Sequence, residues 1–394
     1  MQDKKIAIVD CNNFYVSCER LFNPSLKEKP VAVLSNNDGC IIARSQEVKD
    51  LGVKMGNPVF KLEKDINENI IKFSSNYVLY GDISDRISNH LRNYTNKLEI
   101  YSIDESFLDL SHVKTEDLIP HIKNIKQEIY RLTGIPVSIG VAPNKTLAKL
   151  MNFLSKTKRE LGGVASYWDG HNVDSIEIDE VWGIGRKWKK KLETIGVETI
   201  SQFRQLPDYH VRAMFTIVGL RTWMELNGKY VHDIQTKFKK PKVVTSSRSF
   251  GRTVWHKDQL KDAIWTFLND ITSKLQIEKL NCREVFVFFT TNRFEDNYTT
   301  WTKSIKLWNP KNDTQSIWNE IAKYLEEVPM TLWARAGVIA YSLIDDNIVL
   351  NKLFDDSERS EFLKPEVKSQ MWMTRRDFLS QKFTTDWSQI PVIK

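Results

Sequence analysis

The chain has 394 residues, more than one compact core usually holds, so two to four domains are expected. Hydrophobic residues make up 41% and charged residues 27%, which is ordinary for a soluble globular protein. The first residues lead into only a short apolar strand, and no uninterrupted apolar run approaches the roughly 20 residues of a membrane helix. We therefore expect a cytoplasmic protein with no signal peptide and no membrane contact.

Positive charge is concentrated in one part of the chain. The net charge is +7, and residues 181–258 alone hold 16 Lys and Arg against 6 Asp and Glu, so the remainder is slightly negative. A basic block of this kind suits a polyanion, most commonly nucleic acid. The alternative is a solvated basic surface that has no partner.

The four cysteines stand at positions 11, 18, 40 and 282 and form no Cys-x-x-Cys pair. This spacing indicates neither a zinc ribbon nor a redox motif. We expect buried free thiols in a reducing compartment.

The first 160 residues predict alternating short strands and helices. Their order is strand, helix, strand, strand, helix, strand, helix, once a long insertion after the first helix is set aside. This order is typical of a ferredoxin-like α+β domain. The main predicted elements are strands at 5–11, 98–103, 106–110 and 136–142 and helices at 14–22, 115–132 and 144–159, with a hairpin at 30–43 and a short helix at 45–51 in the insertion.

The second half of the chain predicts a helical segment and a second α+β domain. Short helices surround Gly183-Ile184-Gly185 and Gly196-Val197 within residues 181–206. Residues 237–242 resemble a linker, and the chain turns polar from about residue 345. Between them we expect strands at 243–254, 283–291, 299–307 and 335–343 and helices at 258–279 and 314–326.

Three carboxylates stand where strands of the first domain end. Asp10 ends the first strand, and Asp104 and Glu105 occupy the turn of a later hairpin. The first and third strands of a ferredoxin-like sheet are neighbours, so these acids converge at one edge. Without a basic partner they would repel one another, and a divalent cation would relieve the conflict. Oxygen ligands without His or Cys suit magnesium, although turn acids are more often simply solvated.

Four segments of the chain resemble the Y-family of DNA polymerases. Residues 10–19, Asp-Cys-Asn-Asn-Phe-Tyr-Val-Ser-Cys-Glu, resemble the opening motif of that family, and residues 101–109, Tyr-Ser-Ile-Asp-Glu-Ser-Phe-Leu-Asp, resemble its second metal motif. Residues 34–40 and 375–387 resemble the UmuC branch, which contains the catalytic subunit of bacterial DNA polymerase V. The resemblance spans nearly the whole chain.

The resemblance implies roles for particular residues. Asn12 departs from the family pattern, since many members have an acid there, and Gln46 replaces a frequent Tyr near the triphosphate. The implied site consists of Asp10, Asp104 and Glu105 as catalytic ligands of two Mg²⁺ ions, the Cys11 carbonyl as a backbone ligand, Tyr15 as the residue that blocks a ribose 2′-hydroxyl, and Lys49 and Lys156 as triphosphate contacts.

Two segments resemble DNA-binding parts of the same family. Gly183 and Gly185 belong to a turn that resembles a helix-hairpin-helix, whose backbone N–H groups bind phosphate without regard to sequence. Residues 246–252 resemble the first strand of the little finger, although an ordinary edge strand is the alternative. The cations expected to contact DNA are Arg186, Lys187, Lys189, Lys190, Arg248 and Arg252. We expect Trp255, Trp265, Trp301, Trp308 and Trp318 to pack in the core or between domains rather than stack on bases.

The implied fold is a right-hand polymerase. Its parts would be a ferredoxin-like palm (1–23 and 80–170), small fingers (24–79), a helical thumb (171–236), an α+β little finger (243–345) and a C-terminal tail (346–394). The implied activity is low-fidelity DNA synthesis past lesions in the SOS response to DNA damage, by nucleotidyl transfer with two magnesium ions. A non-catalytic DNA-binding subunit and a nucleotidyl cyclase on the same palm are the alternatives.

The resemblance also implies partners. Primer–template DNA and deoxynucleoside triphosphates would be the substrates. The UmuC branch implies a UmuD-type dimer and a recombinase filament, for which we expect residues 372–387 to contribute a contact. Residues 350–354, Leu-Asn-Lys-Leu-Phe, resemble a sliding-clamp peptide without its leading Gln. A packed tail segment is the alternative for that pentapeptide.

Overall fold

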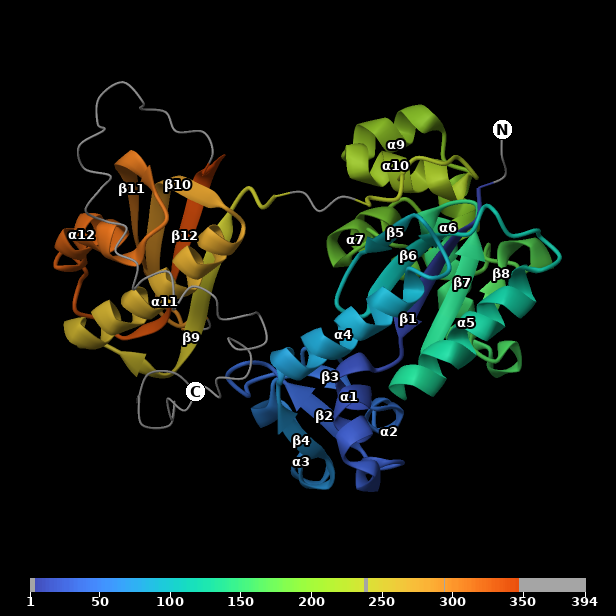
Figure 1. The fold of residues 1–394 in the computed structure, drawn as a ribbon, viewed down its shortest axis with the longest axis horizontal. Helices are drawn as coiled ribbons and strands as arrows, with labels where there is room; N and C mark the ends of the chain where they lie inside the picture. The colour runs from blue at the N-terminus through green and yellow to red at the C-terminus, as the bar shows by residue number, and fades with distance from the viewer. Residues whose placement is uncertain (1–3, 237–239, 294, 347–394) are drawn as a thin grey trace. The chain divides into compact units, whose positions relative to one another are not determined.

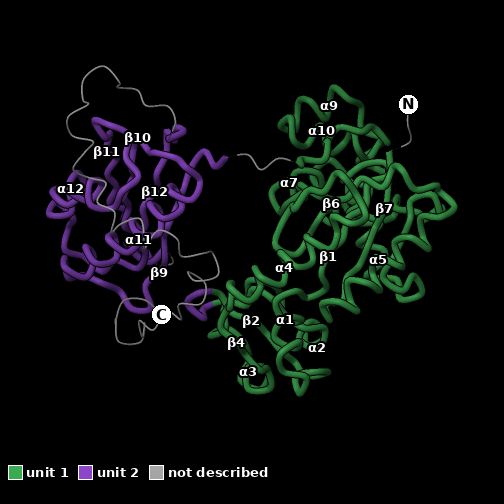
Figure 2. The backbone as a smooth tube through the Cα atoms, viewed as in Figure 1, with its two compact units in different colours: residues 1–35, 40–238 green, residues 36–39, 239–394 purple. Residues whose placement is uncertain are grey.

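The structure is a computed structural model, and it describes residues 4–236, 240–293 and 295–346 (Figure 1). The chain divides into two compact units, residues 1–35 with 40–238 and residues 36–39 with 239–394 (Figure 2). The segments expected to contact a clamp and accessory proteins, 350–354 and 372–387, lie outside the described residues. No helix in the described ranges combines the length and the apolar character needed to cross a bilayer.

A five-stranded sheet forms the centre of the first unit. Its order is β5 (Leu98–Ile100), β6 (Glu105–Asp109), β1 (Ile6–Cys11), β7 (Val137–Ala142) and β8 (Val164–Ser166). β1 runs antiparallel to both β6 and β7, as the ferredoxin-like pattern predicts. The short strand β8, parallel to β7, was not predicted.

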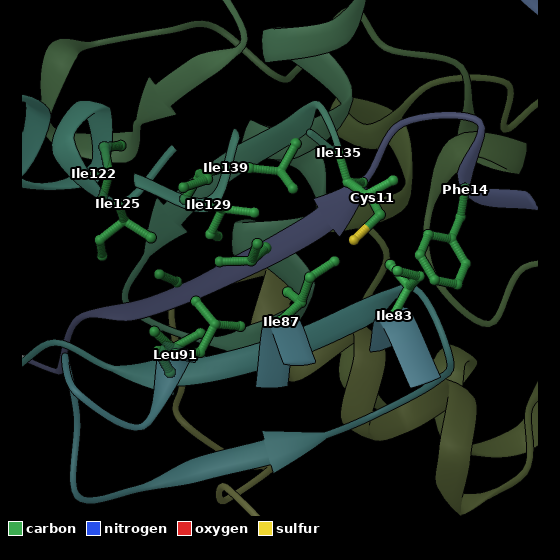
Figure 3. Close-up of a cluster of buried hydrophobic side chains, with 14 of the residues drawn as sticks. Cys11, Phe14, Ile83, Ile87, Leu91, Ile122, Ile125, Ile129, Ile135 and Ile139 are labelled. Carbon is green, nitrogen blue, oxygen red and sulfur yellow. The ribbon is translucent and has the colours of Figure 1, made fainter. Parts of the chain in front are cut away.

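Helices cover both faces of this sheet. α1 (Phe14–Phe22), α4 (Tyr77–Leu91) and α5 (Leu118–Thr133) pack on one face, and α6 (Lys145–Thr157) packs on the other. Residues of β1 therefore alternate between two cores, with Ile8 in one and Val9 in the other. Figure 3 shows the first core, which contains Cys11 from β1, Phe14 from α1, Ile83, Ile87 and Leu91 from α4 and several Ile side chains from α5, with Cys11 at the end near Phe14 and Ile83.

The segment between α1 and α4 forms a small second sheet. Its order is β3 (Ile41–Arg44), β2 (Val31–Leu34) and β4 (Ile71–Ser74), with α2 (Gln46–Asp50) and α3 (Lys64–Asn69) beside it. The predicted hairpin of β2 and β3 is confirmed. β4 pairs parallel to β2 and was missed, as was α4.

Four short helices complete the first unit, and they pack on α6 in one core. They are α7 (Arg186–Glu193), α8 (Ile200–Arg204), α9 (Asp208–Met214) and α10 (Ile217–Leu226). The buried carboxylate of Glu225 in α10 accepts hydrogen bonds from the backbone N–H and the hydroxyl of Thr146, at 3.0 and 2.7 Å. This contact fixes the last of the four helices to the start of α6.

The second unit repeats the strand, helix, strand, strand, helix, strand order. It contains β9 (Val244–Val254), α11 (Lys257–Ile277), β10 (Leu280–Thr290), β11 (Thr300–Lys311), α12 (Thr314–Leu325) and β12 (Trp333–Asp345). Its antiparallel sheet has the order β11, β10, β12, β9, and both helices contribute to one shared core. The predicted second α+β domain is thereby confirmed.

The tryptophans of this unit divide into two groups. Trp301 and Trp318 pack against the core, and Trp265 lies edge-on to Trp318. Trp255 and Trp308 are 45% and 93% exposed, so neither lies in the core of this unit, and packing between domains stays a prediction for them. Trp308 follows the buried Leu307 in β11, and strand alternation therefore directs it away from the core.

Candidate active site

Backbone pairing brings the three predicted carboxylates to one edge of the palm sheet. Asp10 in β1 lies directly opposite Glu105 in β6, and the Cys11 N–H donates to the Asp104 carbonyl at 2.9 Å. Burial raises the pKa of Asp10, Lys156 opposes that change, and the charges of Glu105 and Asp104 raise the pKa further. The three acids are therefore close enough to repel one another.

Two lysines of α6 balance this negative charge. The ammonium of Lys156 lies 2.6 Å from Oδ2 of Asp10, and that of Lys149 lies 2.6 Å from Oε1 of Glu105. Two of the three acids therefore have basic partners, of which Lys156 was predicted as a triphosphate contact and Lys149 was not predicted. Lys149 and Lys156 are seven residues apart, so they share a helix face two turns apart. That spacing was a signal in the sequence that could have identified Lys149.

These acids suit a hard divalent cation, because they offer only oxygen atoms as ligands and because their negative charges repel one another. Within the described ranges, no three His, Cys, Asp or Glu side chains form a group that could hold a metal ion. In this arrangement lysines hold Asp10 and Glu105 instead. The metal-ligand roles therefore stay a prediction.

Neutral side chains orient two of the acids. Asn152 in α6 donates to Oδ2 of Asp10 at 3.2 Å, and the Ser102 hydroxyl donates to Oδ1 of Asp104 at 2.6 Å. Asn152 reaches Asp10 because α6 lies directly on β7 at Gly140. A Cβ atom at Gly140 would stand only 2.2 Å from the backbone nitrogen of Asn152, so only glycine allows this approach. Neither Asn152 nor Ser102 was predicted. The Asn152 contact depends on this close approach of α6 to β7, whereas Ser102 lies only two residues before Asp104 in the same turn.

A cavity of about 360 Å³ joins the acids to the predicted nucleotide-binding residues. Arg44, Lys49 and Lys156 all line this cavity, and burial together with the charges of Arg44 and Lys156 lowers the pKa of Lys49. Glu105 is not among the described residues that line the cavity. The lining includes Asp10, Cys11, Asp104, Tyr15, Lys49, Lys156 and Arg44, the last of which was not predicted.

The predicted thumb turn is present at the start of α7. Gly183 has a φ of +92°, and Gly185 is the N-cap of the helix, where it offers no side-chain oxygen. Lys189 pairs with Asp179 at 2.7 Å and Glu177 at 3.5 Å, so its charge is largely neutralised. The exposed cations of this helix are Arg186, Lys187, Lys190 and Lys191.

The predicted little-finger strand is β9, at one edge of the sheet of the second unit. Arg252 is exposed and Arg248 is half-buried. Arg335 of the neighbouring strand β12 donates to the Ser247 hydroxyl at 3.0 Å and was not predicted. β9 therefore presents hydroxyl and guanidinium groups together.

Comparison with known proteins gives matches over nearly the whole chain. Residues 9–152 match the impB/mucB/samB family, residues 241–351 its C-terminal domain, and residues 362–393 the domain of unknown function DUF4113. Protein SamB of Salmonella typhimurium is 34% identical, covering 98% of this chain and 99% of that protein. Protein UmuC of Salmonella typhimurium is 32% identical, covering 98% and 100%. DNA polymerase IV of Bacillus velezensis is 30% identical, covering 78% and 74%.

Solved structures show the same fold. A Y-family DNA polymerase chimera of Dbh and Dpo4 superposes with a TM-score of 0.69 at 23% identity, covering 86% of this chain and 99% of the chimera. DinB from Sulfolobus solfataricus gives a TM-score of 0.55 over the same coverage. The predicted α+β fold of the right-hand polymerase type is thereby confirmed.

Proposed function

The chain belongs to the impB/mucB/samB family, and from that premise we propose that it is a DNA-directed DNA polymerase that copies damaged templates with low fidelity. The observation that carries the proposal is the cavity that brings Asp10 and Asp104 together with Tyr15, Lys49 and Lys156. Acids for catalysis, cations for a triphosphate and a ring for the sugar are the groups that nucleotide addition requires.

The acids would hold the catalytic cation. Asp10, Asp104 and Glu105, with the Cys11 carbonyl, are the proposed ligands of two magnesium ions. When bound, magnesium stabilises the charge that develops on the phosphoryl oxygens. Asn152 and Ser102 keep two of the carboxylates oriented, and Lys149 keeps the third in place.

Cations in the cavity would bind the triphosphate of the incoming nucleotide. Lys49, Arg44 and Lys156 converge there, which favours a polyanion. The side chain of Lys156 is 36% exposed, so it can turn from Asp10 to a phosphate oxygen. Tyr15 lines the same cavity and would block a ribose 2′-hydroxyl.

DNA contacts would be made through phosphates. The Gly185 turn and the exposed Arg186, Lys187 and Lys190 suit backbone contacts that ignore sequence. Arg248 and Arg252 of β9 are the proposed contacts of the second unit. The fingers comprise only a small three-stranded sheet with short helices, so they would press little on a distorted base pair. Lesion tolerance follows from that weak selection.

We further propose a cytoplasmic location and the partners that the UmuC branch implies, a UmuD-type dimer, a recombinase filament and a sliding clamp. Residues 350–354 and 372–387 are the proposed contact segments. An SOS-linked role is part of the same proposal.

Primer extension by the purified chain tests the polymerase activity. Matched templates with an undamaged base or a single abasic site should both be extended, with and without candidate partners. A chain that binds primer–template DNA but adds no nucleotide to the undamaged template under any of these conditions would be a non-catalytic subunit.

A further inference from the structure

Tyr15 does not face the cavity as an isolated ring. Its ring stacks on that of Tyr80 in α4, with centroids 4.4 Å apart and an interplanar angle of 16°. Tyr77 lies edge-on to both rings, at 5.9 Å from Tyr15 and 6.1 Å from Tyr80. The three tyrosines therefore form one aromatic group, of which Tyr15 lines the cavity.

Tyr80 is the fixed member of this group. It is completely buried, and its hydroxyl donates to Oε1 of Glu19 at 2.7 Å. Burial and this hydrogen bond raise the pKa of Tyr80 well above its usual value, so the hydroxyl stays a donor. Glu19 and Tyr15 are four residues apart in α1 and share one helix face. α1 thus contacts Tyr80 twice, through a stacked ring and through a carboxylate.

A side chain excludes the ribose 2′-hydroxyl by steric clash only if the side chain itself cannot move aside. A half-exposed tyrosine in a helix has other staggered χ1 positions, and a ribose could displace it toward one of them. Tyr80 covers one face of the Tyr15 ring, and it is not among the described residues that line the cavity, so it lies behind Tyr15 as seen from the cavity. Moving Tyr15 away from the cavity therefore requires displacement of a fully buried side chain in a close-packed core.

We propose that Tyr80 is a positioning residue for sugar discrimination, which holds the Tyr15 ring against the cavity so that it rejects ribonucleotides. This inference rests on the proposed role of Tyr15 as the residue that blocks the 2′-hydroxyl. Tyr80 itself does not contact the nucleotide. Its effect is transmitted entirely through the stacked ring.

Single-nucleotide insertion kinetics with matched ribo- and deoxyribonucleotides test this role. Tyr80→Leu removes the ring, and Tyr80→Phe removes only the hydroxyl. We expect Tyr80→Leu to raise the ribo-to-deoxyribonucleotide ratio of kcat/KM about two- to tenfold, the range that corresponds to loss of one stacked aromatic pair. Tyr80→Phe should change the ratio less than twofold. Tyr80→Met keeps the bulk without a flat ring and provides the same comparison if the Leu variant does not fold.

Two controls distinguish loss of the Tyr15 ring position from a general loosening of the core around α4. Ile83→Ala opens a cavity in the same core, three residues along α4. In the double variant Tyr15→Ala/Tyr80→Leu, the ratio should equal that of Tyr15→Ala alone, because Tyr80 acts only through Tyr15. A rise with Ile83→Ala as large as that with Tyr80→Leu would overturn the proposal, as would additive effects in the double variant.

The same kinetics distinguish failure of the proposed role of Tyr15 from failure of the proposed role of Tyr80. Tyr15→Ala should raise the ratio by one to three orders of magnitude, at roughly 1.4 kcal/mol per tenfold change. If Tyr15→Ala raises the ratio and Tyr80→Leu and Tyr80→Met leave it at the wild-type value, only the role of Tyr80 is rejected. If Tyr15→Ala lowers both activities in parallel with the ratio unchanged, the sugar-blocking role of Tyr15 is rejected together with that of Tyr80.

Discussion

At the residue scale, the surroundings of Glu105 explain how one of the proposed catalytic acids is held. The ammonium of Lys149 lies 2.6 Å from Glu105 and 4.8 Å from the centroid of the Tyr101 ring. The indole N–H of Trp182 donates to the Tyr101 hydroxyl at 3.0 Å. A side chain of the thumb segment thereby supports the ring beneath Lys149, which combines an ion pair with a cation–π contact.

Loss of the Lys149 charge should impair catalysis more than DNA binding. Lys149→Met leaves Glu105 without its cation, so the carboxylate loses its fixed position. We expect kcat for insertion to fall about tenfold, equivalent to roughly 1.4 kcal/mol, with DNA affinity changed less than twofold. Lys149→Arg should restore part of the loss. Lys158→Met, at the exposed end of α6, is the matched control. Equal kcat values for the Lys149→Met and Lys158→Met variants would exclude the positioning role.

At the element scale, the start of α7 is the clearest candidate for a DNA surface. Its exposed cations adjoin a glycine turn, whereas Lys189 on the same helix is paired with two acids. Phosphate contacts release counterions, so log K should fall with log salt by about 0.9 per contact.

Neutral substitutions along α7 test that surface. The Lys187→Gln and Lys190→Gln variants should each reduce the salt slope of primer–template binding by up to about 0.9, as measured by fluorescence anisotropy. Lys189→Gln is the matched control and should change the slope far less, because Asp179 and Glu177 already neutralise that lysine. Identical slopes for all three variants and the wild-type chain would show that α7 does not contact phosphates.

The elements found from the sequence are those with regular patterns. β1 and β7 are short, mostly apolar and buried strands, and the acids at the strand ends could be placed together from topology alone. α4 was missed because Ser84 and Ser88 occupy buried positions in its apolar stripe, which weakens the helical period. β4 was missed because it is short and pairs in parallel after a crossover, so no adjacent turn marks it.

Parts of the site escaped prediction for a different reason. Lys149 could have been found from its spacing to Lys156 along α6, but Asn152 and Arg44 carry no motif that was recognised, and their roles depend on contacts between elements. Asn152 reaches Asp10 only because Gly140 lets α6 approach β7 closely. Such contacts arise from packing, which a pattern along one element does not contain.

At the scale of the whole molecule, catalysis and DNA binding are assigned to different parts of the chain. The acids lie in the palm sheet, whereas the basic excess of residues 181–258 extends across the helices α7–α10 and into β9. Removal of a catalytic carboxylate should therefore stop nucleotide addition and leave the phosphate contacts intact.

The most direct test of the polymerase assignment is insertion of one nucleotide by the Asp104→Asn and Glu105→Gln variants, measured beside their affinity for primer–template DNA. Both substitutions keep the size of the side chain and remove its charge. Each should lower the insertion rate by about three orders of magnitude, roughly 4 kcal/mol, while DNA affinity stays within about threefold of wild type. Insertion at the wild-type rate by either variant would contradict the assignment of these carboxylates as the catalytic centre.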